Sequence, residues 1–284
     1  MTQRREQLGE PARYFPVRAE EFRMAPGLFR FGTDFGNGPA DGRYFQQDRA
    51  LADYVAEKRR ILEARPDRLG LLEEPSTVAL RRRASTWMRE ELARDGNGAL
   101  AGAPRGTRED FLELSLEIQE DFALLERGAT GTDRLVALSV CFPSGWEPER
   151  LLGSSFREVH RPIPEFHDVA RSASKLVDAM VERGPYVRFV WTLVADDRLD
   201  HHPRDAPRDA WSDASRGFLR VERQLTVPFR EDHGSLFLIR TYVTPLEVLD
   251  PAERAILRAA VERMPESIRR YKGLEGFPVR LLDP

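Results

Sequence analysis

The sequence of 284 residues has a single cysteine, little net charge and no long apolar run. One cysteine cannot form an internal disulfide, which fits a reducing compartment. The N-terminal stretch MTQRREQLGEPARYF lacks the apolar core of a signal peptide, and nothing approaches the roughly 20 apolar residues that cross a bilayer. We therefore expect a cytoplasmic protein with no membrane partner.

Basic and acidic residues are nearly balanced, with 44 Lys and Arg against 47 Asp and Glu, a net charge of −3 and a pI near 6.1. The two signs are mixed along the chain, which argues against a nucleic-acid partner. The length and the hydrophobic fraction of 41% allow a sizeable core. We expect residues 1–284 to form one domain, in which residues 1–20 are a poorly ordered N-terminal segment.

The first half of the chain has the apolar spacing of helices. This spacing predicts a helix that begins near residue 48 and ends near Pro66, and a second within 74–98 with its N-cap at Ser76 or Thr77. A third is predicted over 108–128, ending at Gly128 as at a helix C-cap. The glycine-rich stretch GALAGAPRG, residues 98–106, is expected to be a mobile loop.

The second half changes to the pattern of strands. Four segments are rich in β-branched, aromatic and other apolar residues: 134–142, 186–194, 218–229 and 235–246. Helical spacing returns over 167–184, and Asp250, Pro251 and Glu253 have the types and positions of a capped helix start. The order predicts an α+β fold, with a helical N-terminal part and a mostly antiparallel sheet flanked by helices.

Strand alternation places two arginines on apolar faces. Arg223 shares its side of FLRVERQLTVPF with leucines and valines, and Arg240 repeats this arrangement in SLFLIRTYV. A guanidinium on a buried face needs an anion. Two interpretations remain open. The arginines form structural ion pairs with Glu222 or an acid elsewhere, or they bind the carboxylates or phosphates of a ligand in bidentate fashion.

His160 lies between apolar residues and two prolines in GSSFREVHRPIPEFH. The prolines restrict the backbone that follows it. A neutral imidazole in a rigid apolar setting suits an axial ligand of haem iron. The alternative is a core histidine bonded to a backbone carbonyl.

Other residues give weaker signals. His201 and His202 lie in a polar stretch and are expected to be exposed, and no histidine pair has zinc-ligand spacing. Cys141 ends an apolar run and is expected to be a small buried hydrophobe, with a thiolate haem ligand as the alternative. The stretch GTDFGNG has neither the spacing nor the preceding strand of a nucleotide-binding loop.

Five motifs occur in an order that resembles one protein family. They are QED (119–121), CFPSGW (141–146), HRPIP (160–164), LRVERQ (219–224) and IRTY (239–242). Together they resemble the haem-dependent oxidative N-demethylase family, over nearly the whole chain. The resemblance implies a PAS-like antiparallel sheet that binds b-type haem through a histidine. It also implies oxidation of aliphatic amines with O₂, using electrons from separate flavin and iron–sulfur proteins.

The resemblance also suggests roles for five residues. His160 would be the axial metal ligand. Arg223 and Arg240 would pair with haem propionates or a substrate carboxylate. Glu222 and Tyr242 would be catalytic polar groups that bind an ammonium or relay protons.

Two positions depart from the family pattern. Leu151-Leu152-Gly153 stands where the family has a lysine shortly before the glycine, and Val190 replaces the asparagine of an R-x-N-W motif. The valine implies an altered substrate or chemistry. Dimethylamine is therefore a doubtful substrate, and a biosynthetic amine or amino acid is as strong a candidate, as in relatives that resemble N-oxygenases.

The expected activity is haem-dependent monooxygenation of an aliphatic amine or amino-acid side-chain amine, by N-oxygenation or oxidative N-dealkylation. The sequence has no Rossmann fingerprint and no cysteine set for an iron–sulfur cluster. Electrons are therefore expected from an external reductase or from peroxide. The alternatives are a non-catalytic haem-binding PAS-like gas or redox sensor and a haem-free small-molecule binder. The oligomeric state stays open.

Overall fold

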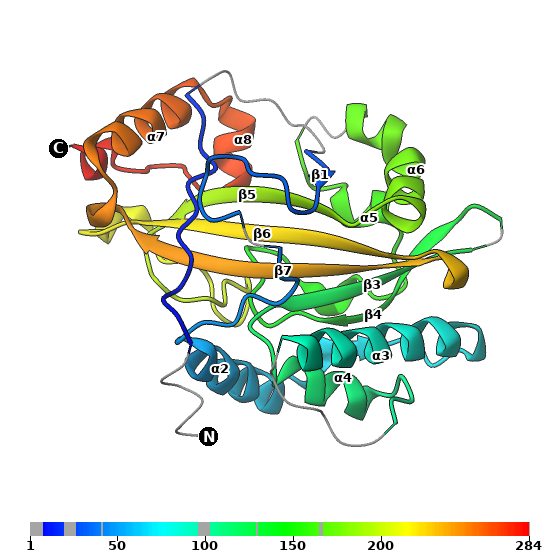
Figure 1. The fold of residues 1–284 in the computed structure, drawn as a ribbon. Coiled ribbons are helices and arrows are strands. Elements are labelled where there is room, and N and C mark those ends of the chain that lie inside the picture. The colour runs from blue at the N-terminus through cyan, green and yellow to red at the C-terminus, as the bar shows by residue number, and fades with distance from the viewer. Residues whose placement is uncertain are drawn as a thin grey trace.

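A central antiparallel sheet organises the molecule. The computed structural model describes residues 8–19, 27–40, 42–95, 103–128, 130–164 and 167–283. Seven strands pair in the order β1-β5-β6-β7-β3-β4-β2 (Figure 1). Their bounds are β1 Phe29–Arg30, β2 Leu69–Leu71, β3 Asp121–Arg127, β4 Asp133–Ser139, β5 Tyr186–Val194, β6 Phe218–Phe229 and β7 Gly234–Pro245. The two longest strands, β6 and β7, occupy the middle of the sheet.

Along the sequence, helices lie before, between and after the strands of the sheet. They are α2 Leu51–Ala64, α3 Val78–Arg94, α4 Arg108–Ser115, α5 Phe156–His160, α6 His167–Glu182, α7 Pro251–Arg263 and α8 Glu266–Tyr271. Figure 1 shows α2, α3 and α4 grouped near the β4 edge of the sheet and α7 and α8 near the β5 edge. The blue N-terminal coil crosses the strands between these groups. The predicted α+β class is confirmed, and the more specific PAS-like form stays a prediction.

The two faces of the sheet differ in what covers them. Odd-numbered residues of β6, such as Leu225 and Val227, pack with helices α2, α3 and α4 in the largest buried apolar cluster. We call this side the packed face. Even-numbered residues of β5 and β6 point the other way, toward the side where Leu125 of β3 packs with Val177 and Val181 of α6. We call this second side the open face.

The segment 108–128 was predicted as one helix, and this prediction is wrong. Helix α4 ends at Ser115, and β3 begins at Asp121. The run DFALL fits a strand as well as a helix, and all five of its residues are buried between β4 and β7. Sheet pairing on both edges therefore outweighs the helical spacing.

The other elements lie close to their predicted positions. Strands β5 and β6 match the predicted segments residue for residue. Asp250 caps α7 through a capping box with Glu253. Tyr14 and Val17, from the N-terminal segment, are buried. Of the predicted mobile loop, residues 98–102 lie outside the described part of the chain.

Among the residues that the structure describes, we find no helix with the length and apolarity to cross a bilayer.

A buried ion pair ties α2 to the start of β3. The Lys58 ammonium lies 3.3 Å from Asp121 Oδ1, and both side chains are almost fully buried. Lys58 also donates to the Glu120 carbonyl. Asp121 Oδ2 accepts a 2.7 Å hydrogen bond from the Phe142 amide. The pair therefore joins a helix, a strand and the chain that leaves β4.

We expect Lys58→Met to lower the free energy of unfolding by about 3–5 kcal/mol, because it leaves Asp121 as a buried charge without its cation. The double variant Lys58→Met/Asp121→Asn removes both charges and should lose less. Urea unfolding of the single and double variants measures both values. A single variant that is more stable than the double variant would contradict this prediction.

Candidate functional site

His160 is held in one orientation by its own helix. Ser155 and Glu158 form a capping box that begins α5, and His160 is its last residue. The His160 Nδ1 lies 2.7 Å from the Phe156 carbonyl oxygen, and the imidazole stacks on the Phe156 ring with centroids 4.0 Å apart. Because a carbonyl only accepts, Nδ1 donates, and in the neutral ring the lone pair lies on Nε2.

The electrostatics of His160 favour this neutral form. Burial lowers the pKa of His160, and the nearby Arg188 lowers it further, although the bond to Phe156 partly offsets both effects. Neutral imidazole with one nitrogen bonded to a carbonyl is the usual arrangement of a metal-ligating histidine. The same bond satisfies a core histidine, so this geometry is compatible with both interpretations of the sequence.

The open face carries polar side chains at the centre of the sheet. Arg188 of β5 lies opposite Gln224 of β6, and Val190 lies opposite Glu222. All four residues are half-buried, although each lies within a strand that is paired along its length. The other elements of the described structure therefore leave this part of the sheet in partial contact with solvent.

Two further cations approach this part of the face. The Lys272 carbonyl accepts a 2.9 Å hydrogen bond from Thr192 Oγ1, whose side chain lies on the open face of β5, and the Lys272 ammonium donates to the Trp191 carbonyl. Arg208 donates to the carbonyls of Lys272 and Ser144 at 2.8 Å. Burial lowers the pKa of Lys272 to about 8, and the Glu222 carboxylate opposes this shift.

One carboxylate thus serves several cations on the open face. Glu222 raises the pKa of Arg188, Arg208 and Lys272, while burial lowers all three. Glu222 itself accepts a 2.9 Å hydrogen bond from Gln224 Nε2. The positive charges exceed the negative ones here, so an anionic group is the complement of this region.

The β3–β4 side of the open face is apolar. Ala123, Leu138 and Val140 form a buried cluster, and partly buried side chains pack against it: Leu135, Trp146, Leu152 and Phe237. Leu135 also packs in the cluster that contains Phe156, the stacking partner of His160. His160 therefore lies between an apolar region on one side and Arg188 on the other.

The structure does not bring the five predicted site residues together. Arg223 and Arg240 face each other across β6 and β7 on the packed face. Tyr242 lies on this same face, because it is two residues from Arg240 in β7. His160 and Glu222 lie on the open side. One planar ligand cannot contact both groups, because the sheet lies between them.

The packed-face residues have partners within the protein. Arg240 Nη2 lies 2.7 Å from Asp48 Oδ2, and its guanidinium is 4.1 Å from the centre of the Tyr54 ring. Arg223 Nη2 donates to the Arg43 carbonyl at 2.8 Å. The Tyr242 hydroxyl donates to Gln46 Oε1. Arg240 thus forms the structural ion pair that was one of the two interpretations, and the acid is Asp48.

Sequence reasoning missed Arg188, Arg208 and Lys272. Alternation applied to YVRFVWTLV puts Arg188 on the same side as Val190, the position that departs from the family motif, so a signal was present for this residue. Nothing local marks Lys272, which follows α8, or Arg208, which lies in a long connection between β5 and β6. Their placement depends on tertiary contacts.

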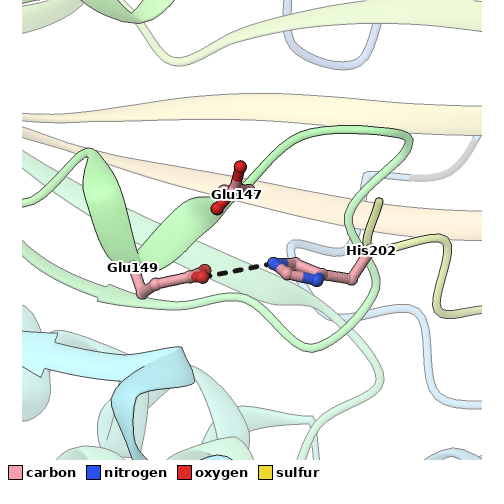
Figure 2. Close-up of side chains that lie close together, drawn as sticks. All are labelled: Glu147, Glu149 and His202. Atoms are coloured by element: carbon pink, nitrogen blue, oxygen red, sulfur yellow. Dashed lines mark hydrogen bonds and ion pairs between the residues drawn. The ribbon is translucent and has the colours of Figure 1, made fainter. Parts of the chain in front are cut away.

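His201 and His202 were expected to be exposed, but both are fully buried. The His201 Nε2 donates to Asp196 Oδ1 at 2.8 Å. Figure 2 shows His202 with its Nε2 directed at Glu149 Oε1, 3.2 Å away, and Glu147 nearby. The loop carries acidic residues that pair with these imidazoles, which lets a polar sequence fold inward.

Glu147, Glu149 and His202 bring three potential metal-ligand atoms within 4.8 Å of one another. The His202 Nδ1 already accepts hydrogen bonds from the amides of Arg204 and Asp205, and its Nε2 is bonded to Glu149. Arg204 also lies 2.8 Å from Glu149 Oε1. Both ring nitrogens are used and an arginine neutralises the acid, so we interpret this group as a structural network.

The model of one family, haem-dependent oxidative N-demethylase, alpha subunit-like, matches residues 75–282. The match covers more than half of the chain and includes every residue of the open face described above. The chain therefore belongs to this family of haem-dependent oxidoreductases.

We expect Arg240→Gln to destabilise the protein by about 3–5 kcal/mol, because Asp48 would lose its buried cation. Haem content per folded molecule should stay unchanged, since Arg240 lies on the packed face. Urea unfolding and Soret absorbance measure the two effects. Arg216→Gln, at an exposed ion pair with Glu247, is the control and should cost at most about 1 kcal/mol. Loss of haem at unchanged stability would contradict this assignment.

We expect the Lys272 ammonium to titrate near pH 8, and Glu222→Gln to lower this pKa further, because the carboxylate stabilises the protonated form. The sequence has only three lysines, Lys58, Lys175 and Lys272. Carbon-13 NMR of labelled lysine ε-carbons resolves them, and Lys272→Arg identifies the signal. A midpoint near the usual value of about 10.4 would contradict the prediction.

Proposed function

We propose that this chain is a haem-dependent monooxygenase that oxidises an aliphatic amine or an amino-acid side-chain amine with O₂ on the open face. The observation that carries the proposal is the geometry of His160. Its Nδ1 is bonded to the Phe156 carbonyl, which leaves the lone pair of the neutral ring on Nε2. The reaction is N-oxygenation or oxidative N-dealkylation.

The open face fits b-type haem in chemistry. The apolar cluster of Ala123, Leu138 and Val140 suits a macrocycle edge, and the cations around Glu222 suit the two propionates. His160 lies between these regions and would hold the iron. When bound, haem supplies the oxidising power for chemistry with O₂. A PAS-like sheet is part of this proposal.

Glu222 is suited to bind the substrate amine. It is the carboxylate at the centre of the open face, and Gln224 fixes its Oε2. An alkylammonium is the complementary group, and Val190 directly opposite Glu222 offers an apolar contact for its carbon chain. Because Val190 replaces an asparagine of the family motif, the substrate meets no side-chain amide at this position. A biosynthetic amine or amino acid fits this change better than dimethylamine.

The overall reaction consumes one O₂, two electrons and two protons, and returns one water. In dealkylation, oxygen adds to the carbon beside nitrogen, and the resulting carbinolamine splits into an amine and an aldehyde. Glu222 and Lys272 are the titratable groups positioned to move protons. We propose that the electrons come from a separate electron-transfer protein or from peroxide, in the cytoplasm, with no nucleic-acid or membrane partner.

We expect His160→Ala to weaken haem binding at least about 100-fold, beyond the range of about 10- to 100-fold seen for second-shell changes. His233→Asn is the control, because His233 is exposed in the β6–β7 turn at φ 49° and asparagine tolerates this conformation. Soret absorbance on haem titration measures both. An unchanged coordination spectrum in His160→Ala would overturn the assignment of the iron ligand.

A turnover assay distinguishes the proposed monooxygenase from a non-catalytic gas sensor. The reduced haem protein is mixed with O₂ and a panel of primary, secondary and amino-acid amines, and O₂ consumption and aldehyde or N-oxygenated product are measured. Amine-dependent consumption supports the monooxygenase. Stable, reversible O₂ binding with every amine would support a gas sensor instead.

A further inference from the structure

Arg188 differs from the other arginines at the centre of the sheet. Within the described ranges its guanidinium forms no hydrogen bond and no ion pair. Arg220, Arg223 and Arg240, on the neighbouring strands, are each bonded to oxygens of the protein. Burial lowers the pKa of Arg188, because its charged form has lost solvent without gaining a close anion. Such a cation is unfavourable without an anionic partner.

The Glu222 carboxylate forms no ion pair with Arg188. Val190 lies opposite Glu222, so Arg188 and Glu222 are diagonal neighbours on the open face, with Cα atoms about 7–8 Å apart. Glu222 is instead engaged with Gln224 and lies 3.7 Å from the Arg220 Nε. A positive and a negative group thus lie diagonally across the β5–β6 pair, next to the apolar Val190, without forming an ion pair.

We propose that Arg188 binds a carboxylate of the molecule held on the open face. The guanidinium fork matches a carboxylate in bidentate geometry, and pairing removes the cost of the isolated charge. The inference rests on the proposed function, in that haem and an amine occupy this face. Two molecules bring a carboxylate there: haem through a propionate, and an amino-acid substrate through its α-carboxylate while Glu222 takes an ammonium.

Two pairs of probes isolate the carboxylate. Haem and haem dimethyl ester differ in the propionates, and L-lysine and cadaverine differ only in the α-carboxylate. Binding of each probe is measured by absorbance or calorimetry to the wild type, Arg188→Gln and Arg188→Lys. Arg183→Gln is the control, because Arg183 is exposed just before β5 and its loss removes the same charge.

Arg188→Gln should weaken binding of the carboxylate-bearing probe about 10- to 100-fold in at least one pair, the range for losing a charged hydrogen bond. The partner without a carboxylate should bind as before. Arg188→Lys should retain part of the preference for the carboxylate-bearing probe. Arg183→Gln should retain the whole preference. If Arg188→Gln loses the preference for haem over haem dimethyl ester, Arg188 binds a propionate. If it loses the preference for L-lysine over cadaverine, Arg188 binds the substrate carboxylate.

If Arg188→Gln keeps the wild-type preference in both pairs, or the wild type has none, the inference is overturned. A protein that binds no haem refutes the proposed function, and the lysine pair still tests Arg188. Stability gives a second readout. Arg188→Met should raise the Tm of the haem-free protein, because it removes an unpaired cation. A lower Tm would show a structural role and overturn the proposal.

Discussion

The alternation of side chains along β6 is the constraint on which both faces depend. Arg220, Glu222 and Gln224 point to the open face, and Arg223 points to the packed face. Because β6 is bonded to β5 and β7 along its whole length, a slip by one residue would exchange the two sets. It would move leucines and valines of the core into the polar region. Burial of these apolar residues therefore fixes the position of Glu222.

The packed face uses its charges to attach the N-terminal part of the chain. Asp48 reaches Arg240, and Gln46 reaches Tyr242, so the segment before α2 is bonded to the centre of β7. Gln119 adds a 3.0 Å hydrogen bond to Asp48 from the chain before β3. Charges that are satisfied in this way specify how the segment docks. On the open face, Arg188, Arg208 and Lys272 share the single carboxylate of Glu222, which makes it the side where an anionic ligand contributes most.

Sequence patterns predicted the sheet well because its strands are long and because packing against neighbouring strands and helices requires apolar side chains at fixed positions. Strands β5 and β6 were found residue for residue, whereas DFALL was assigned to a helix since its five apolar and acidic residues fit either period. The predicted site residues divide between the two faces for a different reason. A search for arginines among apolar residues finds Arg223 and Arg240, and these are bonded within the fold, Arg240 to Asp48 and Arg223 to the Arg43 carbonyl. Arg188 lies among polar neighbours and was therefore overlooked.

The position of His160 follows from topology. Strands β4 and β5 lie on opposite sides of the central sheet, separated by β3, β7 and β6. The connection between them must cross a face, and the packed face is occupied by α2, α3 and α4. The crossing chain carries α5 and α6 over the open face, and α5 ends at His160. The iron ligand we propose thus comes from the crossover, while the groups that meet the amine come from β5 and β6. In this proposal, a change such as valine at position 190 alters the surroundings of the amine without disturbing His160.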